Sequence, residues 1–142
     1  MASNPYLDKI NQTPHAKKLN LKLISSDNNA VTLVLPFSEN IIGDPFDRLI
    51  HSGAITTLID TACGGAIFQL QNSLRALATL DLRVDYMRSA TSGEDVSAYA
   101  QCYKLTHTIA FVRATVFTDD INNPVATAMG TFMRSNKEFP IN

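Results

Sequence analysis

The chain has 142 residues, of which 45% are hydrophobic and 18% are charged, and its formal net charge is −1. This length suits one folded domain with a sizeable core, and the composition excludes a disordered chain. The near-neutral charge gives no reason to expect nucleic acid or an anionic membrane surface as a partner. We therefore expect a single domain over residues 1–142.

The start of the sequence lacks the basic segment and apolar run of a secretory signal, and no apolar stretch reaches the roughly 20 residues of a membrane helix. Cys63 and Cys102 are the only cysteines, too few to indicate a disulfide framework. We expect free thiols, a cytoplasmic location and no membrane partner.

The first third of the chain predicts a short helix and a hairpin. Residues 4–11 can form a leading helix with Asn4 as its cap. Apolar and polar residues alternate over 17–25 and again after the turn sequence at 26–29. Together these patterns predict two antiparallel strands over 17–37.

The period then changes from two to that of a helix. After an irregular stretch over 38–50, apolar residues recur every three or four positions and predict one long helix over about 52–70. Ser52 is its predicted N-cap, because a serine hydroxyl can accept from an early backbone N–H. Most of the helix surface is apolar or small, so we expect the helix to be buried.

Period 2 returns after residue 74 in a segment whose predicted inward-facing residues are Ala78, Leu80, Leu82, Val84 and Tyr86. Further strands fit 94–106, 108–119 and 124–134, with connections too short for parallel crossovers. This order of elements predicts an α+β hotdog fold, in which an antiparallel sheet of five to six strands wraps around one long central helix.

Asp60 is the most informative residue of the predicted helix. Aspartate is unfavourable inside a helix, and the residues one turn away offer no lysine or arginine to pair with it. It is either an ordinary aspartate on a solvent-exposed side of the helix or a functional carboxylate on a buried side. The sequence pattern leaves both readings open.

The helix start is a second candidate, because its first N–H groups lack internal partners and can hold an oxyanion. Gly53 leaves the backbone accessible there, although an ordinary capped helix shares these features. Asp60 lies about 12 Å along the axis from Ser52, too far to serve a carbonyl held at its own helix start. The two groups can act together only if they come from two subunits with antiparallel helices. The Gly64-Gly65 pair would allow such an approach, or packing against its own sheet.

Around these residues the chain resembles the 4-hydroxybenzoyl-CoA/phenylacetic-acid-degradation (PaaI-like) type of hotdog thioesterase. The family motif, His-Gly-Gly with Asp nine residues after the histidine, stands here as His51-Ser52-Gly53 and Asp60. The resemblance is strongest over 40–134. It continues through ATLDLRVDYMRSATSGEDV (78–96), AFVRATVF (110–117) and PVATAMGTFM (124–133).

The resemblance implies hydrolysis of an acyl-CoA thioester, without a cofactor, by a homodimer that can pair into a dimer of dimers. Asp60 matches the catalytic carboxylate, acting as general base or nucleophile, and Thr79 matches a hydroxyl that helps to place the water. The backbone N–H of Ser52, beside Gly53, matches an oxyanion donor from the opposing subunit. His51 matches a position that shapes the loop.

Two departures from the family pattern keep a second function open. Ser52 replaces the first glycine of the motif, and Pro45, which has no backbone N–H, replaces an asparagine of many relatives. The alternative is a non-catalytic hotdog module that binds acyl-CoA or acyl-carrier thioesters. Arg88 and Arg113 could meet the phosphates of coenzyme A or be ordinary surface charges.

Other chemistries have less support in the sequence. The histidines lack metal-ligand spacing with the cysteines, and no glycine-rich phosphate loop is present, so we expect no metal site. Cys63 sits among apolar residues and is predicted to be a core residue rather than a nucleophile. A hotdog hydratase would use a different arrangement of histidine and acidic residue, which we do not find.

Overall fold

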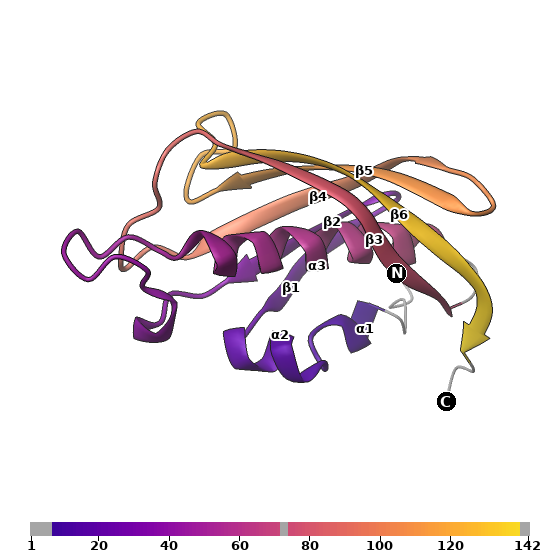
Figure 1. Cartoon of the computed structure of the whole chain (residues 1–142), viewed down its shortest axis with the longest axis horizontal. Helices are drawn as coiled ribbons and strands as arrows, with labels where there is room; N and C mark the ends of the chain where they lie inside the picture. Colours follow the sequence, from indigo (N-terminus) through magenta and orange to yellow (C-terminus); the bar gives the residue numbers. More distant parts are fainter. Residues whose placement is uncertain (1–6, 72–73, 140–142) are drawn as a thin grey trace.

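The computed structural model describes residues 7–71 and 74–139 of the chain. A six-stranded sheet wraps along one long helix, α3 (Ser52–Leu70) (Figure 1). The strands are β1 (Lys22–Asp27), β2 (Ala30–Leu35), β3 (Leu74–Tyr86), β4 (Val96–Leu105), β5 (Ile109–Phe117) and β6 (Ala126–Phe139). Their order is β1-β2-β4-β5-β6-β3, and all neighbours are antiparallel. The predicted hotdog architecture is confirmed, with six strands.

The core lies between α3 and the inner face of the sheet. The apolar side of α3 packs mainly on β2, β4 and β5. It includes Leu58, Ile59 and Ile67, none of which is exposed to solvent. Every second residue of β5 meets this side, as at Val112 and Val116. Burial of each such side chain contributes roughly 1.5–3 kcal/mol, which explains why a helix with so few charges is stable here. The prediction of a buried helix over 52–70 is confirmed.

The N-terminal segment differs from the prediction. The short helix α1 (Leu7–Ile10) falls within the helix expected over 4–11, whereas the expected cap Asn4 lies outside the described residues. A second helix, α2 (Pro14–Leu19), occupies the first part of the strand predicted over 17–25. That strand, β1, begins only at Lys22.

Local capping explains this second helix. The Thr13 hydroxyl accepts from the backbone N–H of Ala16, and Pro14 has a φ already suited to the first turn. Asn20 ends the helix in the left-handed conformation, with φ 58°. The prediction of a strand is therefore wrong for residues 17–21, because the leucine alternation joined the end of a helix and its cap to the start of a strand.

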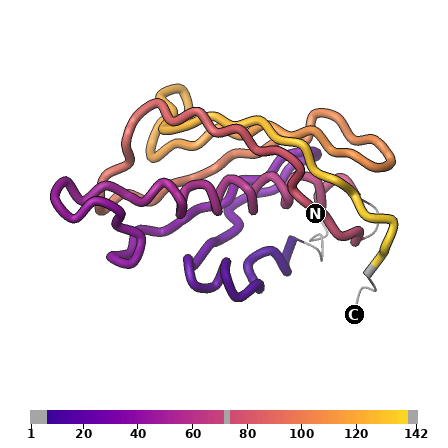
Figure 2. Tube along the Cα trace, in the orientation of Figure 1, coloured from indigo at the N-terminus to yellow at the C-terminus, as the bar shows by residue number. Residues whose placement is uncertain are grey.

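The N-terminal helices run beneath α3, on the side away from the sheet (Figures 1 and 2). Gly65 allows this approach, because a Cβ there would lie 2.8 Å from Ile10 Cδ1 and 3.2 Å from Val31 Cγ2. Gly65 therefore packs within its own subunit. Gly64 differs, since the nearest side-chain atom to a Cβ built there is Leu77 Cδ1 at 4.0 Å.

Strand β3 lies at the edge of the sheet and contains a β-bulge. Its register with β6 shifts between Thr79 and Asp81, so Leu80 stands opposite no residue of β6. Thr79 consequently faces α3, and Leu80 is 55% exposed. The predicted strand is confirmed, but the inward positions of Ala78 and Leu80 are wrong, since both residues are exposed. One extra residue exchanges the two faces of a strand, so the predicted alternation holds only after the bulge.

Candidate active site

Asp60 lies in the third turn of α3, on the side that faces β3. Its carboxylate oxygen Oδ1 accepts a 2.7 Å hydrogen bond from Thr79 Oγ1. Neither ion pair found within residues 7–71 and 74–139 involves this partly exposed carboxylate. One oxygen is therefore oriented by a hydroxyl, and the other can accept from a water molecule. We call Asp60 and Thr79 the carboxylate half-site.

A cavity of about 350 Å³ opens beside this half-site. Asp60 and Thr79 line it together with apolar side chains from four elements, which are Ile10, Phe68, Leu77 and Phe132. A carboxylate at the mouth of an apolar cavity suits a ligand with a reactive polar group and an apolar tail.

The start of α3 is capped by His51 rather than by Ser52. Nδ1 of His51 accepts a 2.8 Å hydrogen bond from the backbone N–H of Gly53. The ring must then carry its proton on Nε2 when it is neutral. The prediction of Ser52 as N-cap is wrong, because the accepting group is an imidazole one residue earlier, which cap preferences based on hydroxyls and carboxylates overlook.

The cap also decides which backbone donor is available. Gly53 gives its N–H to His51, whereas no described residue accepts from the N–H of Ser52. The Ser52 N–H lies at the positive end of the α3 dipole and can bind an oxyanion. Gly43 holds the preceding loop against the cap, since a Cβ at Gly43 would lie 2.8 Å from His51 Cα.

Tyr86, at the end of β3, ties the sheet to this first helical turn. Its hydroxyl lies 2.9 Å from the carbonyl oxygen of Ser52 and 2.6 Å from Thr56 Oγ1. Thr56 Oγ1 lies 3.0 Å from the same carbonyl oxygen. We call His51, Ser52, Gly53, Thr56 and Tyr86 the helix-start half-site. The contribution of Tyr86 was missed from the sequence, although its inward position on the strand was a usable signal.

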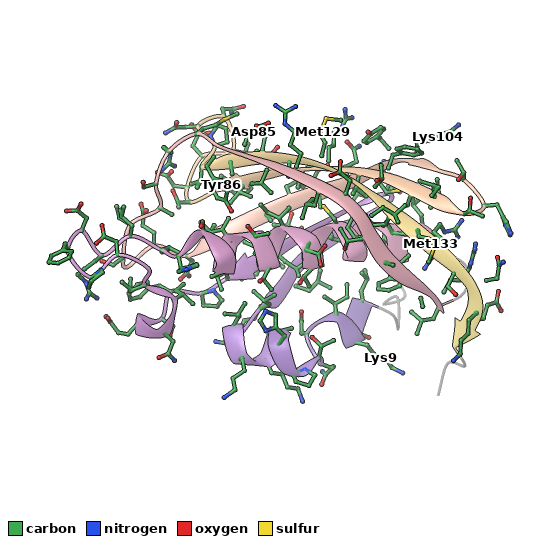
Figure 3. The ribbon with its side chains drawn as sticks, viewed as in Figure 1. Lys9, Asp85, Tyr86, Lys104, Met129 and Met133 are labelled. Atoms are coloured by element: carbon green, nitrogen blue, oxygen red, sulfur yellow. The ribbon has the colours of Figure 1, made fainter. Side chains whose placement is uncertain are left out.

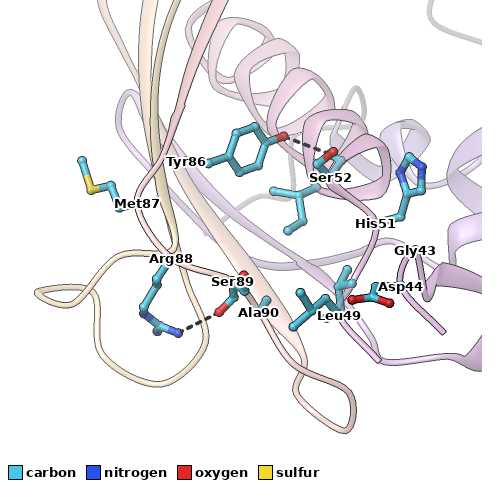
Figure 4. A pocket seen from close by; sticks show the side chains of 12 residues that line it. Gly43, Asp44, Leu49, His51, Ser52, Tyr86, Met87, Arg88, Ser89 and Ala90 are labelled. Carbon is cyan, nitrogen blue, oxygen red and sulfur yellow. Dashed lines mark hydrogen bonds between the residues drawn. The ribbon is translucent and has the colours of Figure 1, made fainter. Parts of the chain in front are cut away.

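A second cavity, of about 510 Å³, opens at the helix-start half-site (Figure 4). Its lining includes His51, Ser52, Tyr86 and Arg88. The guanidinium of Arg88 donates to Thr118 Oγ1 and to the carbonyl oxygen of Asn123, each at 3.2 Å. Arg88 is thus a positive charge fixed at the edge of this cavity.

Arg113 lies elsewhere, on the face of the sheet opposite α3. It donates to Gln101 Oε1 at 3.0 and 3.1 Å, and its guanidinium carbon lies 5.1 Å from the ring centre of Tyr103. Figure 3 shows Met129, a neighbour of Arg113 on that outer face. The structure brings together Asp60 with Thr79, and His51 with Ser52, Gly53 and Arg88, but not Arg113 with either group.

Cys63 takes no part in the candidate site. It is fully buried, and burial, followed by the nearby charge of Asp60, raises the pKa of its thiol to about 12. A protonated thiol is a poor nucleophile, so the prediction of a core residue is confirmed. Cys63 and Cys102 are both free, as expected. The described part of the chain holds neither a cluster of metal-ligating side chains nor a helix able to cross a membrane.

Comparison with known proteins finds a family model that matches this chain. The model of the thioesterase superfamily matches residues 48–125, more than half of the chain. A Pseudomonas aeruginosa protein of known structure is 38% identical, over 92% of this chain and 96% of its own, with a TM-score of 0.82.

Two more distant structures share the fold. A thioesterase family protein of Silicibacter pomeroyi is 22% identical, over 93% of this chain and 96% of its own, with a TM-score of 0.81. PaaI of the E. coli phenylacetic acid degradation operon is 17% identical, over 96% and 97%, with a TM-score of 0.82. No curated protein matches the chain.

Proposed function

Since the chain belongs to the thioesterase superfamily, we propose that it hydrolyses an acyl-CoA thioester to a free acid and coenzyme A. The observation that carries this proposal is the position of Asp60, a carboxylate without an ion-pair partner among the described residues, at the mouth of an apolar cavity. Its 2.7 Å hydrogen bond from Thr79 leaves Oδ2 free to act on a water molecule or on the substrate.

As general base, Asp60 takes a proton from water while the water oxygen forms a bond to the thioester carbonyl carbon. The carbonyl oxygen gains negative charge, which a backbone N–H at a helix start can stabilise. Collapse of this intermediate breaks the C–S bond, and the departing sulfur takes up the proton. As nucleophile, Asp60 would instead form a bond to the carbonyl carbon while the C–S bond breaks and coenzyme A leaves as a thiolate. Water would then hydrolyse the resulting anhydride to the free acid and the Asp60 carboxylate.

The oxyanion donor must come from a second copy of the chain. Ser52 lies eight residues before Asp60 on one straight helix, which separates them by about 12 Å. We propose that the unpaired edge of β3 joins β3 of a second subunit, which would set the two helices antiparallel. Leu80, Tyr86 and Met87 at this edge are large apolar residues that are 45–57% exposed. A fully active monomer in sedimentation experiments would refute the dimer.

Face matching and charge limit the registers available to this edge. Opposite residues of antiparallel strands point to the same face, so a two-fold axis in the regular part of β3 passes through a residue. An axis at Leu82 sets Arg83 against the partner's Asp81. An axis at Arg83 would oppose two arginines and would set Asp81 against the partner's Asp85. An axis at Val84 would also pair opposite charges, because it sets Arg83 against the partner's Asp85. We propose the axis at Leu82, because its position relative to the two half-sites decides between these two registers.

The axis at Leu82 also suits the site. It lies nearly midway between Thr79, which contacts Asp60, and Tyr86, which contacts Ser52. The helix-start half-site of one subunit would therefore come near the carboxylate half-site of the other. We assign the cavity beside Arg88 to the coenzyme A part of the substrate, because its fixed charge suits a phosphate.

Thiol release from a panel of short, medium, long and aromatic acyl-CoAs tests the proposal. Asp60→Asn should lower kcat by about 10²-fold or more without changing the dimer, because the amide cannot accept the proton. Asp27→Asn, at an exposed position on β1, is the matched control and should keep wild-type turnover. An Asp60→Asn variant as active as wild type would contradict the assignment.

Pro45 supports one alternative. This residue cannot supply the amide donor that many relatives have at its position, and a non-catalytic module that binds acyl thioesters would not need one. Tight acyl-CoA binding without turnover by the wild-type protein would favour this second function, and rapid turnover would exclude it.

A further inference from the structure

One side of α3 points into the cavity beside the carboxylate half-site. Asp60, Gly64 and Phe68 all line this cavity, and they follow one another at intervals of four residues. Residues at this spacing lie above one another on the same face of a helix. The cavity therefore extends along α3, away from the helix start, for two turns beyond Asp60.

The walls of this cavity are mainly apolar beyond its mouth. Thr13 and Thr61 also line it, but their hydroxyls bond to the backbone N–H of Ala16 and to the carbonyl oxygen of Thr57. Leu77 of β3 and Phe132 of β6 form the side next to the sheet, and Ile10 of α1 covers the opposite side. A third cavity, of about 220 Å³, shares Ile10, Thr13 and Phe68 with the cavity beside the carboxylate half-site and continues toward Leu74. The space thus has one polar end, at Asp60 and Thr79, and a mainly apolar interior that continues past Phe68.

Gly64 keeps this space open. A Cβ at Gly64 would find no atom outside its own helix closer than Leu77 Cδ1 at 4.0 Å, so nothing in the packing of the chain requires a glycine there. At neighbouring Gly65 a Cβ would lie 2.8 Å from Ile10 Cδ1, which does explain a glycine. Glycine inside a helix costs about 1 kcal/mol relative to alanine, so its presence at an open position points to a ligand that needs the room.

We propose that the acyl chain of the substrate extends from the thioester at Asp60 across Gly64 to Phe68, beneath α1, and that the preferred substrate carries a straight aliphatic chain of medium length. This inference rests on the proposed thioester hydrolysis. The path from Asp60 to Phe68 spans eight residues of helix, or about 12 Å. A zigzag of C–C bonds of about 1.5 Å advances roughly 1.3 Å per carbon, so the path accommodates about eight to ten carbons.

The far end of the path is lined by the cationic residues Lys9 and Arg75 as well as by apolar side chains. Arg75 lines the 220 Å³ cavity, but its guanidinium donates to the carbonyl oxygens of Ser135 and His107, at 2.6 and 2.8 Å. Arg75 therefore presents its apolar stem to the far end of the path, beside Leu74, Ala76 and Lys9.

The test is the dependence of kcat/KM on acyl chain length, from two to sixteen carbons, for variants at the two ends of this path. Gly64→Val should lower kcat/KM for ten-carbon substrates about tenfold or more and leave four-carbon substrates within about twofold. Phe68→Ala should move the optimum to longer chains. Gly64→Ala, which favours the helix, should give a smaller shift in the same direction as Gly64→Val.

Met129→Ala is the matched control, because Met129 lines a cavity of about 330 Å³ on the outer face of the sheet. It should leave the chain-length profile unchanged. Equal losses at all chain lengths in the Gly64 variants, an aromatic optimum in wild type, or a shifted profile in Met129→Ala would each overturn the acyl path while thioester hydrolysis stands. Absence of turnover by wild type on every substrate would overturn the proposed hydrolysis itself.

Discussion

In the proposed reaction, the two half-sites on α3 would use different parts of the chain for chemistry. The carboxylate half-site depends on side chains, since Asp60 and Thr79 meet through a 2.7 Å bond between α3 and β3. The helix-start half-site offers a backbone N–H at Ser52, and its side chains only hold that turn in place. A side-chain function is lost by substitution of one residue, whereas a backbone function survives most substitutions.

This difference explains why Ser52 can replace the glycine of the family motif. The N–H is the same in both residues, and His51 rather than residue 52 caps the helix. The half-sites also differ in what they need from their surroundings. Asp60 is placed by one regular helix and one strand, while Ser52 depends on a loop that passes close to His51 at Gly43.

Ser52→Pro should break the helix-start half-site alone. Proline lacks the N–H but is favoured at the first position of a helix, and His51, with φ −63° and ψ 127°, has the conformation that a following proline requires. We expect kcat to fall about 10²- to 10³-fold, with α3 intact by circular dichroism. Ser52→Ala, which keeps the N–H, should remain within about threefold of wild type, and an equal loss in both variants would show that the hydroxyl matters instead.

Mixed dimers of Asp60→Asn and Ser52→Pro subunits test whether the half-sites combine across subunits. Each mixed dimer would have one site with both groups intact and one site with neither. Random mixing of equal amounts should therefore restore about one quarter of wild-type kcat, far above either inactive parent. Recovery should appear only after subunit exchange. Persistent inactivity of mixed dimers verified by mass would place Asp60 and its oxyanion donor in one subunit.

The sequence predicted the carboxylate half-site better than the helix-start half-site, for a physical reason. Helical periodicity placed Asp60 within a helix whose predicted and observed bounds agree, and that periodicity reflects burial along a single element. The position of Thr79 opposite Asp60 depends on the bulge at Leu80, and a bulge is set by pairing with β6. Only the family resemblance, not the alternation, joined Thr79 to Asp60.

The features of the helix start that were not predicted arise between elements distant in sequence. Tyr86 reaches Ser52 across 34 residues, and Gly43 meets His51 through the fold of a loop. The helix at 14–19 was missed because its last residues and its C-cap Asn20 were read as part of an alternating pattern. Periodicity along one segment carries no information about such contacts.

Thr79→Val should weaken the carboxylate half-site without removing it. Valine keeps the shape and the β-branch of threonine, so the strand should be preserved, but the donor to Asp60 Oδ1 is lost. We expect kcat to fall about tenfold with little change in KM. Thr79→Ser retains a hydroxyl and should recover most of the activity, whereas similar losses in both variants would assign the effect to packing.

Tyr86→Phe should have the smallest effect, because it acts on the support of the helix-start half-site. Loss of the hydroxyl removes the contacts of 2.9 Å to the Ser52 carbonyl oxygen and 2.6 Å to Thr56 Oγ1. We expect the free energy of unfolding to fall by about 1 kcal/mol and kcat by about twofold to fivefold, since the Ser52 N–H remains but is held less firmly. Tyr99→Phe, on the outer face of the sheet, is the control and should change neither quantity. A Tyr86→Phe variant with reduced stability and full kcat would show that Tyr86 supports the fold but not the oxyanion donor. The rigidity of the first turn of α3 would then not limit kcat.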